Sequence, residues 1–268
     1  MASAIPPDEA AEYAARTQTP AIPAATLVVF RRDSAGGPPQ LLLLQRSREM
    51  AFAGGAAVFP GGRIDPSDRE LAARLASADE AWADELAARI AAIRETLEEA
   101  GLLIGIAQRA TAEEAAAARA HLLEQGALAP VLAGFGWRLE PALLVPFARW
   151  RPRYRHTRVF DTRFYLADLG TGAVALAADG AETTRLFWAS AAEALRLADS
   201  GAIKVIYPTR RNLERLAQFA DFAAAKAHAE AFPVRTISPC VEERDGTRWL
   251  TIPDDCGYPV TGQPLSET

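Results

Sequence analysis

The chain has 268 residues and a mass of 28.7 kDa, and half of its residues are hydrophobic. This size fits one large domain, or a domain with an appendage, better than a multi-domain array. Its net charge of −5 and pI of about 5.4 give no long-range attraction for a polyanion, so nucleic acid is not an expected partner. No apolar run approaches the roughly 20 residues that span a bilayer, and the first residues lack the basic start of a signal peptide. We therefore expect a cytoplasmic protein without a membrane partner.

The N-terminal part of the chain predicts an arm followed by strands. Residues 1–23 are rich in Pro, Ala and Thr and have no sustained periodicity, which indicates an arm. Apolar runs at 25–30 and 41–45 flank a Gly-Gly-Pro-Pro cluster and predict two strands joined by a turn. The glycine- and proline-rich stretch that follows predicts a loop, interrupted only by a short strand at 57–59.

A long helical stretch comes next. Residues 69–100 contain no Gly or Pro, although Ser77-Ala78-Asp79 offers an N-cap that would divide the stretch into two helices. Gly101 is placed to end the second helix. Residues 111–125 repeat the Ala, Glu and Leu composition and predict a further helix that ends at Gly126.

The C-terminal half alternates strand-like and helical segments. Strands are expected at 137–150, 159–166 and 186–190, helices at 190–199 and 212–231, and a hairpin with an Asp-Gly turn at 237–253. Strands interspersed with helices predict an α/β or an α+β sandwich. Cys240 and Cys256 are too few for a disulfide framework and are expected to be free thiols.

The C-terminal turns of the 69–100 stretch carry an unusual charge pattern. On a helix, the apolar residues from Ile90 to Ala100 form one stripe, and three carboxylates crowd the opposite face: Glu95, Glu98 and Glu99. Like charges at this spacing, at the negative end of the helix dipole, are unfavourable. A divalent cation with oxygen ligands, Mg²⁺ or Mn²⁺, would offset them. The alternative is an ordinary solvated acidic surface.

A glycine-rich segment upstream favours a functional site. Phe59-Pro60-Gly61-Gly62-Arg63 places two adjacent glycines after a proline, which lets the backbone approach a ligand closely. A loop of this kind before an acidic helix is typical of a binding site.

These two segments together resemble the signature box of the nudix hydrolase family. The second half of the box, Arg-Glu-apolar-any-Glu-Glu-any-Gly-apolar, matches Arg94 to Leu102, with Thr96 at the apolar position. The first half matches Gly62 followed by five residues and Asp68, where the family usually has Glu. Twenty-five residues instead of seven separate Asp68 from Arg94, and we expect the insertion to add a helix before the catalytic one.

The resemblance implies a nudix-type α/β/α sandwich with a mixed β-sheet. The nudix domain would cover 24–268, with a helical insertion at about 69–88 and the hairpin as a C-terminal extension. An inserted box is similar to that of the mammalian peroxisomal coenzyme A diphosphatases. Family members often pair, so a homodimer is compatible with the resemblance.

A second pattern resembles coenzyme A-cleaving members of the family. Leu42-Leu43-Leu44-Gln45-Arg46-Ser47, Gly55 and Phe59-Pro60-Gly61-Gly62 stand at the pattern's spacings, with Leu44 in place of Thr and Ala51 in place of a second Arg. A cation is expected to hold the 3′-phosphate of coenzyme A. Arg46, Arg48 or the run Arg151, Arg153, Arg155 and Arg158 could supply it, although that run is equally compatible with a solvated loop.

The resemblance implies hydrolysis of the diphosphate linkage of a nucleoside diphosphate derivative, most simply coenzyme A or an acyl-coenzyme A, to 3′,5′-ADP and 4′-phosphopantetheine. Mg²⁺ or Mn²⁺ would be held by Glu95, Glu98, Glu99 and the carbonyl of Gly61. Arg94 completes the catalytic group, and the general base is Glu95 or Glu182. The expected substrate-binding residues are Arg46, Ser47, Gly55, Gly62, Arg63 and Arg158.

Two other functions stay open at this point. One is an ADP-sugar or dinucleotide diphosphatase; the extra motif of the NADH-cleaving group, Ser-Gln-Pro-Trp-Pro-Phe-Pro, does not occur in the sequence. The other is a catalytically silent nucleotide-binding module, against which the intact residues Arg94, Glu95, Glu98 and Glu99 speak. Trp137, Phe187 and Trp188 are expected in the core rather than stacked on a base.

Overall fold

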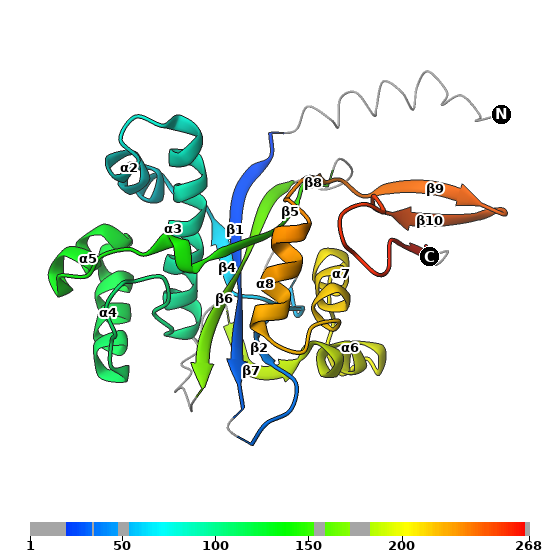
Figure 1. Cartoon of the computed structure of the whole chain (residues 1–268), viewed down its shortest axis with the longest axis horizontal. Coiled ribbons are helices and arrows are strands. Elements are labelled where there is room, and N and C mark those ends of the chain that lie inside the picture. The colour runs from blue at the N-terminus through cyan, green and yellow to red at the C-terminus, as the bar shows by residue number, and fades with distance from the viewer. Residues whose placement is uncertain (1–19, 34, 48–53, 153–158, 172–182, 266–268) are drawn as a thin grey trace.

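The computed structural model describes residues 20–33, 35–47, 54–152, 159–171 and 183–265. A central sheet lies between two groups of helices, and a small second sheet extends from one side (Figure 1). The strands of the central sheet are β1 (Ile22–Arg32), β2 (Gln40–Arg46), β3 (Ala57–Val58), β4 (Gly61–Arg63), β5 (Val145–Trp150), β6 (Phe160–Thr171), β7 (Thr183–Ser190) and β8 (Thr236–Ile237). The small sheet contains β9 (Cys240–Arg244), β10 (Thr247–Thr251) and β11 (Gly262–Pro264).

Helices cover both faces of the central sheet. On one side lie α2 (Pro66–Leu75), α3 (Glu80–Ala100), α4 (Ala112–Gln125) and α5 (Leu128–Phe135); on the other lie α6 (Ala191–Asp199), α7 (Tyr207–Leu216) and α8 (Phe222–Ala231). The strand order is β3-β2-β1-β6-β5-β8, with β4 paired to β1 and β7 to β2. The β1–β6 and β5–β8 pairs are parallel and the other pairs are antiparallel. The predicted α/β/α sandwich with a mixed sheet is confirmed.

β1 shows why its apolar run is nearly continuous. Leu27 and Val29 pack in the core that includes α3, whereas Val28 and Phe30 pack in the core that includes α7 and α8. A strand covered on both faces needs apolar residues at successive positions. The parallel register then aligns Ile22 with Phe160 and Thr26 with Phe164 at the N-terminal ends of β1 and β6.

The predicted division of the 69–100 stretch is confirmed. The side chain of Asp79 accepts a hydrogen bond from the Trp82 N–H at 2.9 Å, which starts α3, and Gly101 ends it with φ of 70°. α2 is the extra helix before α3. It begins at Pro66, three residues before the predicted start, because Asp65 and Asp68 form a capping box around its first turn.

Four of the predicted segments need correction. The stretch 212–231 is two helices, since Asp221 caps a new helix by accepting from the Ala224 N–H at 2.8 Å. The stretch 137–150 is a strand only from Val145 onward and is preceded by a 3₁₀ turn at Pro141–Leu143. The eight-residue α5 was not predicted, and β4 pairs within the stretch predicted to be a loop.

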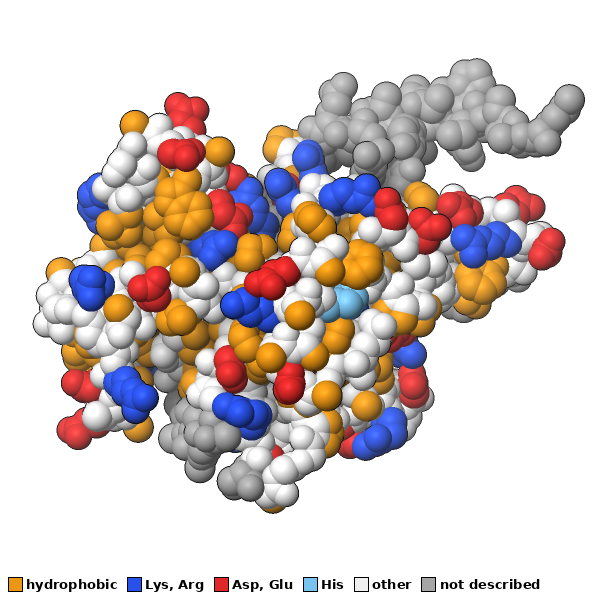
Figure 2. Space-filling view, viewed as in Figure 1, with side chains coloured by type: hydrophobic (Ala, Val, Ile, Leu, Met, Phe, Trp, Pro, Cys, Tyr) orange, Lys and Arg blue, Asp and Glu red, His pale blue; other side chains and the backbone are white. Residues whose placement is uncertain are grey.

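The C-terminal hairpin is confirmed. β9 and β10 pair across a turn at Asp245 and Gly246, both with positive φ. Cys240 and Cys256 are free thiols. Within the described ranges, no helix is long and apolar enough to cross a membrane. On the face shown in Figure 2, acidic and basic side chains are interspersed rather than gathered into a field of one sign.

Candidate active site

The two halves of the box meet around a buried ion pair. Arg94 Nε lies 3.0 Å from Asp68 Oδ1, and Arg94 Nη2 lies 3.0 Å from Asp68 Oδ2. Arg94 is 4% exposed and Asp68 is 1% exposed. Arg94 Nη2 also donates to the carbonyl of Arg63 at 2.9 Å, so the guanidinium joins α2, α3 and β4. The helical insertion therefore leaves the two halves of the motif in contact.

The two glycines of β4 let the sheet edge and α3 approach each other. A Cβ on Gly62 would lie 2.3 Å from Glu95 Oε1, and a Cβ on Gly61 would lie 2.4 Å from the carbonyl oxygen of Ala25. The N–H of Gly61 donates to Glu99 Oε2 at 2.8 Å. A side chain at Gly61 would collide with the backbone of β1, and one at Gly62 would have to displace the Glu95 carboxylate, which explains why the segment has glycine at both positions.

The acidic face of α3 is largely covered instead of being a fully solvated surface opposite the core. Glu99 is only 6% exposed, whereas the side chain of Glu98 is 39% exposed. The cover comes from β4, which lies over this end of the helix and pairs with β1. Thr96, at the usual apolar position of the box, is buried and donates its hydroxyl to the carbonyl of Ala92 at 2.7 Å.

Arg94 is the cation around which these carboxylates are arranged. Besides Asp68 it contacts Glu95 at 3.0 Å, Glu98 at 3.4 Å and Asp65 at 3.5 Å. Burial raises the pKa of Glu95 to about 7, although the charge of Arg94 acts in the opposite direction. Several carboxylates with one guanidinium leave an excess of negative charge, which favours a cationic ligand.

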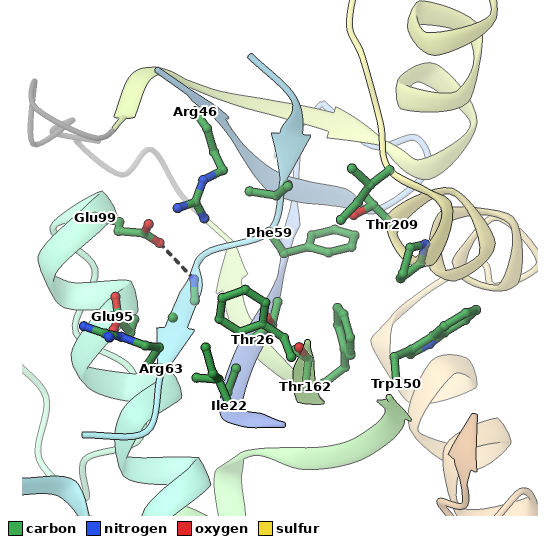
Figure 3. A pocket seen from close by; sticks show the side chains of 18 of the residues that line it. Ile22, Thr26, Arg46, Phe59, Arg63, Glu95, Glu99, Trp150, Thr162 and Thr209 are labelled. Carbon is green, nitrogen blue, oxygen red and sulfur yellow. Dashed lines mark hydrogen bonds between the residues drawn. The ribbon is translucent and has the colours of Figure 1, made fainter. Parts of the chain in front are cut away.

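A cavity of about 800 Å³ opens beside the acidic cluster and continues to an aromatic end (Figure 3). Its acidic end contains Glu95, Glu98 and Glu99, with Arg46 and Arg63. The N-terminal ends of β1 and β6 form part of its lining through Ile22, Ala24, Thr26, Phe160, Thr162 and Phe164. Trp150 and Thr209 lie at its other end (Figure 3), and Phe59, Ile206 and Pro208 also line the cavity.

Comparison with solved structures identifies the family. The chain is similar to a NUDIX hydrolase from Alicyclobacillus acidocaldarius, with 31% identity and a TM-score of 0.65 over 78% of this chain and 97% of that one. The chain belongs to the nudix hydrolase family. A scan against models of known protein families found no match.

Two further solved structures have lower TM-scores. The NUDIX domain of Shewanella oneidensis NrtR, solved with ADP ribose, shares 16% identity with a TM-score of 0.40 over 76% of this chain and 94% of that one. A C. elegans Ap4A hydrolase shares 19% identity with a TM-score of 0.38 over 72% and 92%.

As a nudix hydrolase, the protein is an enzyme acting on phosphoanhydrides, and nudix hydrolases generally use divalent metal ions. The chemistry of the donors fits such an ion, because hard cations prefer carboxylate and carbonyl oxygens. In the described ranges, however, no group of three His, Cys, Asp or Glu side chains converges around one point. Glu95 is turned toward Arg94, and Glu99 accepts from the Gly61 N–H. A cation would therefore compete with these contacts.

The predicted residues of this nudix hydrolase fall into three groups. Arg46, Gly62 and Arg63 line the cavity with the acidic cluster. Ser47 and Gly55 are not among the described lining residues, and they bond to each other instead, with the Gly55 N–H donating to the Ser47 carbonyl at 3.3 Å. Arg158 and Glu182 lie outside the described residues.

The aromatic end of the cavity was not predicted. The signal was the alternation of Phe160, Thr162 and Phe164 in a strand, which indicates one face carrying two rings and a hydroxyl. For Trp150, the sequence predicted a position in a sheet segment but no role in the site. Trp137 is buried in the core as expected, and Phe187 and Trp188 pack against the two cores.

Proposed function

We propose that the protein hydrolyses the diphosphate linkage of coenzyme A or an acyl-coenzyme A to 3′,5′-ADP and 4′-phosphopantetheine. The observation that carries the proposal is one continuous cavity with a polar, charged end and an aromatic end. Such a cavity suits a long substrate with a diphosphate in its middle and less polar groups beyond it. The coenzyme A-type spacing from Leu42 to Gly62 supports the same substrate class.

Divalent metal ions, Mg²⁺ or Mn²⁺, are part of the proposal. Glu95, Glu98 and Glu99, with the carbonyl oxygen of Gly61, would hold them. When bound, such ions neutralise the diphosphate and lower the pKa of a nearby water. Arg94 would keep Glu95 and Glu98 in place, since it contacts both and is itself fixed by Asp68.

The proposed reaction is a displacement at phosphorus. A water oxygen bonds to one phosphorus, the bridging P–O bond breaks, and its electron pair leaves with the other phosphate. The base that takes the water's proton is Glu95 or Glu182. Replacing the true base with Gln should lower kcat and remove the acidic limb of the pH–rate profile, while the other variant keeps that limb.

A substrate panel tests the proposal. The protein is incubated with Mg²⁺ and, in parallel, with coenzyme A, ADP-ribose, a dinucleoside polyphosphate and NADH, and the released phosphomonoesters are identified. Preferential cleavage of coenzyme A supports the proposal. Preferential cleavage of another compound would show that this compound, and not coenzyme A, is the substrate. If no compound yields a product, a catalytically silent binding module is favoured.

Recognition of the 3′-phosphate has its own test. We propose that Arg46, which points toward the acidic end of the cavity (Figure 3), or the arginines of the 151–158 run bind this group. Dephospho-coenzyme A should then have a higher KM than coenzyme A, and Arg46→Gln should narrow the difference if Arg46 is the contact. Equal KM values for the two compounds in the wild-type protein would show that these arginines do not bind the 3′-phosphate.

A further inference from the structure

The aromatic end of the cavity includes Trp150, whose indole is fixed from behind. Trp150 lies on β5 and is 1% exposed. Its Nε1–H donates to the hydroxyl oxygen of Tyr258 at 3.1 Å, and that hydroxyl donates to Asn212 Oδ1 at 2.7 Å. Since the indole nitrogen can only donate, the direction of this chain of hydrogen bonds is determined.

Ring packing holds the same indole. Tyr258 meets Trp150 edge to face, with centroids 5.8 Å apart and an interplanar angle of 90°, and Tyr207 does so at 6.0 Å and 82°. Burial raises the pKa of Tyr258 to about 12, so its hydroxyl keeps the proton that it donates to Asn212 at neutral pH. The indole therefore has a hydrogen bond and two rings that oppose its rotation.

The segment that supplies Tyr258 does not itself reach the cavity. Tyr258 follows β10 and is separated from Trp150 by 108 positions. In the described part of the chain, no residue after Thr209 lines the cavity. Tyr207 is tied to the same region, because its hydroxyl donates to the Leu250 carbonyl of β10 at 3.1 Å. The C-terminal region thus contacts the cavity wall only from its outer side.

We propose that Tyr258 is a positioning residue, which orients the Trp150 indole as a wall of the substrate cavity and thereby contributes to substrate binding. The proposal rests on the proposed function in one respect, namely that this cavity receives the substrate. It assigns to the C-terminal region a role in binding that does not require direct contact with substrate.

The test is a double-mutant cycle on KM. Tyr258→Phe keeps the ring and removes the hydrogen bonds of its hydroxyl, including those with Trp150 and Asn212, and Trp150→Phe removes the indole donor. With coenzyme A or whichever diphosphate is hydrolysed, Tyr258→Phe should raise KM about fivefold, the equivalent of one hydrogen bond, with kcat within about twofold of wild type. The double variant should match Trp150→Phe alone, because Tyr258 acts through that indole.

Tyr207→Phe is the matched control. It makes the same chemical change on a ring that also packs on Trp150, but its hydroxyl bonds the Leu250 carbonyl and not the indole, so KM should rise less than in Tyr258→Phe. Additive effects of Trp150→Phe and Tyr258→Phe, an unchanged KM in Tyr258→Phe, or a loss confined to kcat would each overturn the proposal.

A measurement without turnover separates this proposal from the proposed function. In NMR spectra, the Trp150 indole N–H, assigned by its loss in Trp150→Phe, should exchange with solvent faster in Tyr258→Phe than in wild type. Unchanged exchange would overturn the positioning role even in an active enzyme. If no diphosphate is hydrolysed, the proposed function fails, and the indole exchange still tests whether Tyr258 holds Trp150.

Discussion

The guanidinium of Arg94 lies against the carboxylate of Asp68, with two of its nitrogens each 3.0 Å from a different carboxylate oxygen. Asp68 sits in the first turns of α2 and Arg94 in the last turns of α3, so this contact fixes the two helices relative to each other. The family's usual Glu has a longer side chain. Asp68 nevertheless reaches Arg94, whose guanidinium also donates to the Arg63 carbonyl of β4, and Asp68 Oδ2 accepts from the Asp65 N–H.

Asp68→Asn should strongly destabilise the fold, because it leaves the buried guanidinium of Arg94 without its main counter-charge. The expected loss in the free energy of unfolding is about 3 kcal/mol. Urea denaturation followed by circular dichroism measures it. Asp65→Asn is the control, since Asp65 is 40% exposed at its side chain and lies farther from Arg94, at 3.5 Å. Equal losses in the two variants would contradict the special role of Asp68.

Gly62→Ala should impair catalysis more than stability. The new Cβ would lie 2.3 Å from Glu95 Oε1, so the Glu95 carboxylate would have to move away from β4. A misplacement of about 1 Å in a catalytic group costs on the order of a hundredfold in rate. Steady-state kinetics and thermal denaturation separate the two effects. Gly134→Ala in α5 is the control, because its nearest neighbour, His121, lies 3.4 Å from the added Cβ; it should keep wild-type kinetics.

Glu98→Gln and Glu99→Gln should each lower kcat by about a hundredfold and weaken Mn²⁺ binding, if these carboxylates hold the cation. Their effects on stability should differ. Glu98 is partly exposed and tolerates the change, whereas Glu99 is buried and accepts from the Gly61 N–H, so its variant should lose about 1 kcal/mol.

Mn²⁺ titration by calorimetry and urea denaturation check both effects. Glu80→Gln, at an exposed position in the first turn of α3, is the control: it should leave Mn²⁺ binding unchanged and cost at most about 0.5 kcal/mol through the helix dipole. Wild-type turnover in Glu98→Gln would exclude that carboxylate from the mechanism.

Because of His228, the free energy of unfolding should decrease at mildly acidic pH. Burial and the positive charge of Arg215 lower the pKa of His228, and Arg215 Nη2 donates to its Nδ1 at 3.3 Å. Below the ordinary histidine pKa of 6.5, the unfolded chain binds a proton that the folded chain binds only at lower pH. The contribution of His228 to stability is therefore present above pH 6.5 and is lost as the pH falls through the lowered pKa.

Urea denaturation between pH 7 and 5 tests this contribution. His228→Gln should lose less stability than wild type over that range, and His121→Gln, in α4, serves as the control. A wild-type slope in His228→Gln would show that other groups cause the loss.

The sequence predicts the fold well where a local signal has one meaning. Asp79, Gly101 and Gly126 mark helix ends in the structure as they do in the sequence. Local signals fail where tertiary contacts decide: residues 61–63 read as a loop because glycines have low strand propensity, but pairing with β1 makes them a strand. Residues 212–231 likewise have a long apolar side that suggests one helix, although the structure has two helices, the second beginning after Asp221.

The candidate site likewise has one half that the sequence predicts and one half that it does not. Its acidic half lies within one helix and one glycine-rich segment, so spacing alone indicates Glu95, Glu98 and Glu99. Its aromatic half is assembled from β5, β6 and the start of α7, which no short pattern connects. Tyr258 could not be found from the sequence, since its importance depends on a hydrogen bond to a residue more than a hundred positions away.

The order of these parts along the chain has a consequence for biosynthesis. The acidic helix and its glycine strand precede Trp150 in the chain, but the residue behind Trp150 is synthesised 108 positions after it. A nascent chain can form the cluster of carboxylates well before Tyr258 is available to hold Trp150 in the opposite wall of the cavity. Premature termination just before β10 would thus yield a protein that retains the charged half of its cavity while its indole wall lacks support.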